Sequence, residues 1–176
     1  SLLGDAVANA LSGGAGNDLL IAGDGGSTII GGAGDDHIIG GHGVDTVDYS
    51  GDAAPVRVDL TQGFTADGSG GHDTLISIEN VIGSQGADVI IGNQKDNVIV
   101  GGAGADTLTG GEGSNTFVLR GLSEGGDTIT DFTTGQDHTL YFDDNGSQDG
   151  YTVVAHLQPS AHLAATDVRI TDHALA

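Results

Sequence analysis

Cysteine is absent from this chain of 176 residues, so neither disulfides nor thiolate-bound metals contribute to its structure. Positive charge is scarce too, because only four lysines and arginines stand against 25 aspartates and glutamates. Binding to nucleic acid or another polyanion requires clustered basic side chains, whereas these four are scattered along the chain. No apolar run reaches the length of a membrane-spanning helix. The sequence therefore predicts neither a nucleic-acid partner nor a membrane span.

The negative charge that remains has a physical consequence. A formal charge of −21 opposes compaction unless counter-ions are bound. Glycine accounts for 33 residues and proline for only two, while the hydrophobic fraction of 37% is too high for a simple solvated linker. A fold that depends on bound cations explains this composition better than disorder does. Without the cations, disorder is the expected state.

Nine-residue repeats occupy much of the chain. Four of them fit the pattern Gly-Gly-x-Gly-x-Asp-x-U-x, in which U is a large apolar residue: 13–21 (GGAGNDLLI), 31–39 (GGAGDDHII), 83–91 (GSQGADVII) and 101–109 (GGAGADTLT). More degenerate copies continue the nine-residue spacing within two blocks, at 4–12, 22–30 and 40–48 in the first and at 92–100 and 110–118 in the second. Position eight is apolar in every copy, as Leu11, Leu20, Ile29, Ile38, Val47, Ile90, Ile99, Leu108 and Phe117.

The repeat chemistry points to a hard cation. Glycines at positions one, two and four allow positive φ and let backbone carbonyls converge where a Cβ would obstruct them. The aspartate at position six adds a carboxylate. Carboxylate and carbonyl oxygens suit Ca²⁺, whose coordination number is flexible, and offer nothing to zinc or copper. A three-residue strand is too short to be stable alone, so the copies must stack.

These motifs resemble the calcium-binding nonapeptide repeats of RTX proteins. The resemblance implies an all-β fold, a right-handed parallel β-roll (β-solenoid), in which repeat n lies over repeat n+2 and each ion sits between stacked turns. On this chain it pairs Asp18 with Asp36, Ser27 with Asp45, Asp88 with Asp106, and Asn97 with Asn115. The two pairs without two aspartates are expected to be weaker or empty sites, with Asp24 as a possible substitute ligand near Ser27.

The predicted cofactor is therefore several Ca²⁺ ions, held by repeat glycines and by position-six side chains. The predicted ligand residues are Gly14, Gly16, Asp18, Asp24, Gly32, Gly34, Asp36, Gly41, Gly43, Asp45, Gly86, Asp88, Asn97, Gly102, Gly104, Asp106, Gly111, Gly113, Asn115, Asp127, Asp131 and Asp137.

Three segments interrupt or follow the repeats within a single predicted domain, 1–142, that carries the repeats at 4–48 and 83–118. Residues 49–82 form an insertion with two expected strands, near 56–60 and 75–78, separated by a turn-forming run at 67–73. Residues 119–142 contain D-x-I-x-D-F-x-x-G-x-D, which resembles the segment after the repeats in proteins exported by type I secretion. We expect it to cap the roll through Phe117, Phe132 and Phe142. Residues 143–176 flank the domain and match the position of an uncleaved secretion signal.

No catalytic site is predicted, because the seven histidines are scattered and the repeats account for the aspartates. The expected function is a calcium-binding module that folds on Ca²⁺ binding outside the cell. It would support export, by the type I secretion machinery, of a larger secreted or surface protein such as an adhesin, with further domains upstream in the same polypeptide. Two alternatives remain: a carbohydrate-binding accessory module, like those of alginate epimerases, and the C-terminal domain of a secreted protease or lipase.

Overall fold

The computed structural model describes residues 1–120, 126–132, 139–143 and 152–156. Every regular element within these residues is a β-strand. In the described part of the chain, no helix is long and apolar enough to cross a membrane. The all-β class predicted from the sequence is confirmed.

Two sheets contain all the strands of the described residues. Sheet A holds nine, in the order β1-β3-β5-β9-β8-β7-β11-β13-β15, and sheet B holds eight, in the order β17-β16-β14-β12-β10-β6-β4-β2. The strands of sheet A are β1 (Leu2–Leu3), β3 (Leu19–Ile21), β5 (His37–Ile39), β7 (Arg57–Asp59), β8 (Phe64–Ala66), β9 (His72–Ile76), β11 (Val89–Ile91), β13 (Thr107–Thr109) and β15 (Thr128–Ile129). Those of sheet B are β2 (Ala10–Ala15), β4 (Thr28–Ala33), β6 (Thr46–Asp48), β10 (Asn80–Ile82), β12 (Val98–Val100), β14 (Thr116–Arg120), β16 (Thr139–Asp143) and β17 (Thr152–His156).

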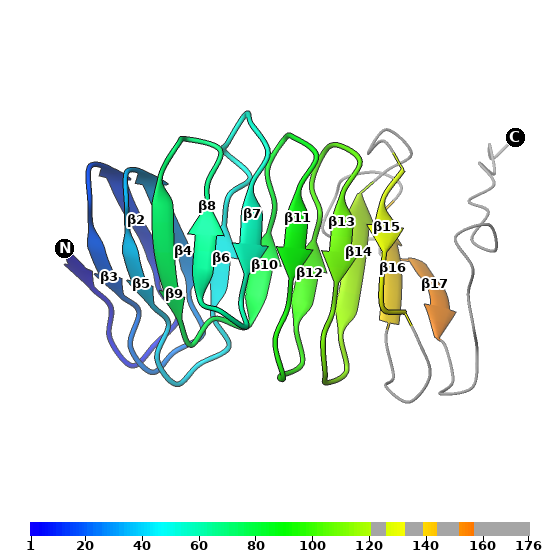
Figure 1. Ribbon diagram of the computed structural model, residues 1–176. Helices are drawn as coiled ribbons and strands as arrows, with labels where there is room; N and C mark the ends of the chain where they lie inside the picture. The colour runs from blue at the N-terminus through cyan, green and yellow to red at the C-terminus, as the bar shows by residue number, and fades with distance from the viewer. Residues whose placement is uncertain (121–125, 133–138, 144–151, 157–176) are drawn as a thin grey trace, which may run out of the picture.

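Within the nonapeptide repeats the chain alternates between the two sheets, so successive strands do not pair there and each strand lies on the one two repeats away. Leu20 is in register with Ile38, and Ile29 with Val47, both in parallel pairs. Figure 1 shows the resulting stack of turns along one axis, with the N-terminus and β3 near one end and β17 near the other. The structure is a parallel β-solenoid, and the predicted stacking of repeat n on repeat n+2 is confirmed.

Side chains at position eight form the core between the sheets. All nine are buried, and all except Leu11, which is 8% exposed, have no exposed surface. Alternation along a strand directs positions seven and nine outward, and Leu19 and Ile30 at these positions are 37% and 42% exposed. Because each copy buries one large side chain, stability comes from the stack and not from any single repeat.

Residues 49–82 contribute four strands. Strand β7 pairs with β11 in parallel, while β8 joins β7 to β9 through antiparallel pairs on both sides. Strand β8 was not expected from the sequence, since Phe64–Ala66 has only three residues and its central residue is polar. Strands β9 and β10 belong to the regular parallel stack, where they pair in register with β5 and β6 respectively. The segment thus replaces one regular turn by an antiparallel hairpin inside sheet A.

Beyond the last repeat, the core closes on aromatic side chains. Phe132 is 8% exposed, and its ring lies 6.0 Å from the fully buried ring of Phe117. Strand β16 continues sheet B, and Leu140 is in register with Phe117. The contact of Phe117 with Phe132 agrees with the predicted cap; the side chain of Phe142 lies outside the described residues.

Candidate metal sites

The turns of the solenoid form two edges, which differ in chemistry. Edge A consists of the turns that lead into sheet A, and edge B of those that lead into sheet B. At position six, edge A carries Asp18, Asp36, Asp73, Val56, Asp88, Asp106 and Asp127 in spatial order. Edge B carries Asn9, Ser27, Asp45, Glu79, Asn97 and Asn115.

Along edge A, the position-six carboxylates form a ladder. The backbone N–H of Asp18 donates to Asp36 Oδ1 at 2.8 Å, and that of Asp36 donates to Asp73 Oδ1 at 3.0 Å. Beyond the hairpin, the N–H of Asp88 donates to Asp106 Oδ1 at 2.8 Å, and that of Asp106 to Asp127 Oδ1 at 2.9 Å. The Oδ1 atoms of Asp36, Asp73, Asp106 and Asp127 thus each accept a backbone N–H. The Oδ2 of Asp88 accepts the Ser84 N–H at 2.6 Å, and that of Asp73 accepts the Tyr49 hydroxyl at 2.9 Å.

Among the described residues, four aspartate oxygens are buried without a protein partner, two of them in the edge A ladder. Oδ2 of Asp36, Asp45, Asp67 and Asp106 has no hydrogen bond, although each residue is at most 7% exposed. A buried carboxylate oxygen without a partner costs free energy unless a cation or water binds it. Among the described residues, no three acidic or histidine side chains converge closely enough to hold a metal by themselves. An ion here must therefore also use main-chain carbonyls.

The glycine turns supply those carbonyls. A Cβ added to Gly32 would collide with the carbonyl oxygen of Gly14, and one on Gly41 with that of Gly23. Both glycines have positive φ, at 101° and 108°. Of the predicted glycine ligands, all except Gly43 and Gly86 have positive φ. Carbonyls and carboxylates thus line the same turns, which is the oxygen-only donor set that Ca²⁺ prefers.

Burial raises carboxylate pKa values along edge A. The pKa of Asp106 is raised to about 7, mainly by burial and further by the negative charges of Asp127 and Asp88. Burial, with the charges of Asp67 and Asp36 adding to it, raises the pKa of Asp73 to about 6. The pKa values of Asp36, Asp88 and Asp127 are also raised, in each case mainly by burial. Without cations, the negative charge of edge A therefore opposes folding at neutral pH.

In the second block of repeats, side chains on edge B donate hydrogen bonds to the main-chain carbonyls of the turns. The side-chain amide of Asn97 donates to the Glu79 carbonyl at 2.7 Å, and that of Asn115 donates to the Glu112 carbonyl at 3.2 Å. Glu79, 4% exposed, pairs one oxygen with the Lys95 ammonium and accepts the Asp45 N–H with the other at 3.0 Å. On this edge, side-chain N–H groups and an ammonium of the protein therefore contact the turn oxygens. On edge A, by contrast, the Oδ2 atoms of Asp36 and Asp106 have no such partner.

The remaining predicted ligands fall in different places. Asp24 is largely exposed and contacts His42 Nδ1 at 2.9 Å. Asp127 joins the edge A ladder, whereas Asp131 accepts the N–H groups of Gly110 and Gly111 at 2.9 and 2.7 Å. Asp137 lies outside the described residues.

Sequence analysis missed two position-six carboxylates, Asp73 on edge A and Glu79 on edge B. Residues 68–76 read GSGGHDTLI, which fits the repeat pattern and begins with Gly-Ser like the copy at 83–91. The copy is out of phase with the others, so a search at fixed nine-residue spacing passes over it. Allowing a phase shift would have found Asp73. No comparable signal precedes Glu79, because its turn is shortened.

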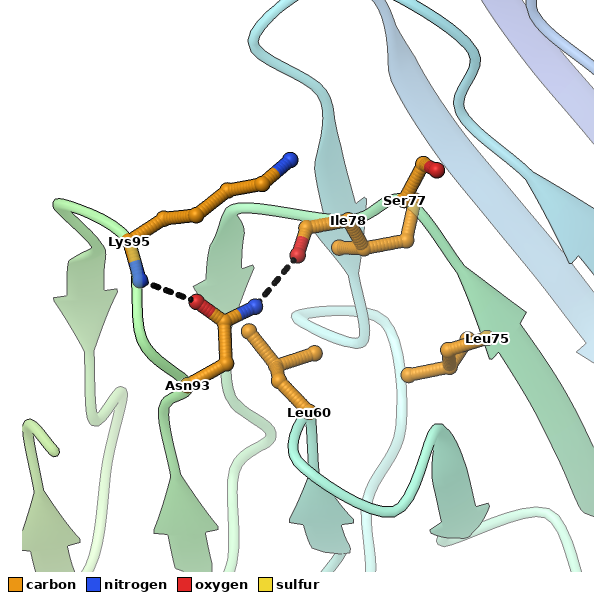
Figure 2. A pocket seen from close by; sticks show the side chains of 6 residues that line it. All are labelled: Leu60, Leu75, Ser77, Ile78, Asn93 and Lys95. Carbon is orange, nitrogen blue, oxygen red and sulfur yellow. Dashed lines mark hydrogen bonds between the residues drawn. The ribbon is translucent and has the colours of Figure 1, made fainter. Parts of the chain in front are cut away.

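A cavity of about 220 Å³ opens beside edge B, lined by Leu60, Leu75, Ser77, Ile78, Asn93 and Lys95. Figure 2 shows Asn93 at its rim, where its amide donates to the Ile78 carbonyl at 3.1 Å and accepts the Lys95 N–H at 2.9 Å. Among the described residues that line it, none is acidic or a histidine.

Comparison with known families agrees with this geometry. A family model for the RTX calcium-binding nonapeptide repeat, in four copies, matches residues 3–26, 23–53 and 82–117. The matched segments contain the Asp18–Asp36 and Asp88–Asp106 pairs, but not residues 54–81, where β7, β8 and β9 lie. No curated protein matches the sequence significantly.

Proposed function

We propose that calcium binding along edge A drives the folding of this chain outside the cell. The chain belongs to the family of RTX calcium-binding nonapeptide repeats. The module binds several Ca²⁺ ions, as its repeats do in the family, and it has the all-β solenoid that these repeats form. Its role in this proposal is to support type I secretion and folding of a larger secreted or surface protein, such as an adhesin.

One observation carries the proposal: in the ladder of edge A carboxylates, the buried Oδ2 atoms of Asp36 and Asp106 have no protein partner. Ions that bind only the folded state stabilise it by RT ln(1+[L]/Kd), which is about 2.7 kcal/mol for each site at a hundred times its Kd. Several such sites together are comparable to a typical domain stability of roughly 5–15 kcal/mol. Calcium is thus able to decide whether the chain is folded.

The physical sequence of events follows from charge. Where calcium is scarce, as in a bacterial cytosol, repulsion among 25 acidic residues keeps the chain extended and suited to a narrow export channel. Outside, calcium neutralises edge A and the repeats stack. Binding of an acidic polysaccharide fits less well, because the Lys95 ammonium is already paired with buried Glu79.

Circular dichroism tests the proposal. After calcium is removed with a chelator, the full chain should show a disordered spectrum, and millimolar calcium should restore the β signal. Magnesium at the same concentration should do so poorly, because it requires compact octahedral geometry and retains its waters. A chelated chain with an unchanged β spectrum would contradict the proposal.

A further inference from the structure

The break in the repeat series places a carboxylate that belongs to no repeat against edge A. Asp67 follows β8 directly and precedes β9, so it lies at the end of the antiparallel hairpin. It is 7% exposed, and its Oδ1 accepts the N–H groups of Ser69 at 2.9 Å and Gly71 at 2.7 Å. Two hydrogen bonds from its own turn thus fix the orientation of the carboxylate.

The other oxygen of Asp67 has no hydrogen-bond partner although it is buried. A Cβ on Gly71 would collide with the carbonyl oxygen of Gly34 and would lie 2.8 Å from Asp67 Oδ2. The two oxygens therefore border the same small space, which only glycine at position 71 leaves open. One is a carboxylate oxygen and the other a main-chain carbonyl oxygen.

A second unpartnered oxygen belongs to the neighbouring turn. Asp36 is 2% exposed, its Oδ2 lacks a hydrogen bond, and its N–H donates to Asp73 Oδ1 at 3.0 Å. Among the described residues, no Lys, Arg or His side chain forms an ion pair with Asp36, Asp67 or Asp73. Negative charge therefore gathers at this junction without a protein cation to balance it.

We propose that Asp67 is a calcium ligand contributed by the hairpin, binding an ion at this junction together with the Gly34 carbonyl and the Asp36 carboxylate. Two carboxylates and a carbonyl give three of the six to eight oxygens that Ca²⁺ takes, and water completes the shell. The ion links the first block of repeats to the hairpin that replaces a regular turn. This inference rests on the proposed function, since the same cation serves both.

Crystals of the full chain grown with calcium provide a test that needs no variant. Anomalous scattering should show a calcium peak within coordination distance of Asp67 Oδ2 and Gly34 O, in addition to peaks at the Asp18–Asp36 and Asp88–Asp106 turns. Peaks at the repeats with none beside Asp67 would overturn this inference and leave the proposed function intact. No calcium peak anywhere would overturn both.

A matched pair of variants gives a test in solution. Asp67→Asn keeps the Oδ1 acceptor for Ser69 and Gly71 and removes only the charge and the free oxygen. Asp52→Asn is the control, because Asp52 supports the same loop with both oxygens occupied, by Gly68 N at 3.1 Å and Ser69 Oγ at 2.9 Å. Native mass spectrometry in calcium should count one ion fewer in Asp67→Asn and no change in Asp52→Asn. An unchanged count in Asp67→Asn would overturn the inference; if that variant does not fold, the crystal peaks decide.

Discussion

Edge A and edge B are built from the same backbone repeat, but they differ in what contacts the oxygen atoms of their turns. On edge A, aspartate recurs at position six, and Asp36 and Asp106 each keep a buried oxygen without a protein partner. On edge B of the second block, Asn97 and Asn115 donate side-chain N–H groups to turn carbonyls instead. One edge thus leaves room for mobile cations, and the other carries its donors in the chain.

The difference shows that a nonapeptide can keep its structural role without an aspartate at position six. Position eight remains buried on both edges, as Leu108 and Phe117 illustrate, with no exposed surface on either side chain. Replacing aspartate by asparagine removes a negative charge and adds two N–H donors. Because such a turn carries its own hydrogen-bond donors, we expect calcium dependence to be concentrated on edge A and on Asp45.

A change that affects both edges equally sets the scale for this comparison. Phe132→Ala removes a ring that packs on Phe117 at the end of the core, and truncation of a buried phenylalanine typically costs about 3–5 kcal/mol. Denaturant unfolding in saturating calcium should show this loss, with the dependence of stability on calcium concentration unchanged. Phe64→Ala, at a ring that is 38% exposed, is the control and should cost less. A loss confined to low calcium would instead assign Phe132 to ion binding.

A second prediction separates the edges directly. Asp106→Asn should remove one ion from edge A, which costs about 2.7 kcal/mol at a calcium concentration of a hundred times Kd. Asn115→Ala leaves a buried N–H of Asn97 without its acceptor and should cost about 1–3 kcal/mol. Because these totals overlap, the measurement is the slope of unfolding free energy against log calcium concentration. The slope should fall for Asp106→Asn alone; equal slopes in both variants would remove the distinction between the edges.

Much of this arrangement follows from the sequence because the repeat is chemically regular. Leu20, Ile38, Ile90 and Leu108 recur at one position, and a short strand with one large apolar residue has only stacking as a route to burial. The pairing of Asp18 with Asp36 and of Asp88 with Asp106 follows from the same register, and the backbone hydrogen bonds agree with it.

The parts that sequence analysis missed lie where the phase changes. Strand β8 depends on pairing with β7 and β9 on both sides, so its own residues signal it weakly. Val56 takes an aspartate position on edge A, where its N–H donates to Asp88 Oδ1 at 2.8 Å. The role of Lys95 beside Glu79 is equally hidden, because 16 residues separate them and neither fits the repeat.

Acid should replace calcium in part on edge A. A carboxylate whose folded pKa is raised binds its proton more tightly when folded, so its contribution to stability is present below the unfolded pKa of 3.8 and lost as pH rises through about 6 for Asp73 and about 7 for Asp106. Protein freed of calcium on a chelating resin should therefore gain β signal in circular dichroism between pH 7.5 and pH 4.5. Because protons compete with the ion, the apparent Kd of the folded chain for calcium should rise as pH falls. A calcium-free chain equally disordered across this range would contradict the raised pKa values.

The smallest expected effect comes from Lys95→Gln, which tests whether an ammonium on edge B occupies the place of an ion. Lys95 is 60% exposed, so its pair with Glu79 should add only about 1 kcal/mol in saturating calcium. Its removal leaves Glu79 beside Asp45, whose pKa is raised mainly by burial, with the Glu79 charge adding to it and Lys95 opposing it. The two carboxylates then resemble a pair on edge A, and the slope of stability against log calcium concentration should increase. Arg57→Gln removes the same charge from an exposed position in sheet A and should leave that slope unchanged. A Lys95→Gln slope equal to that of the unaltered chain would mean that the lysine neutralises Glu79 without excluding calcium.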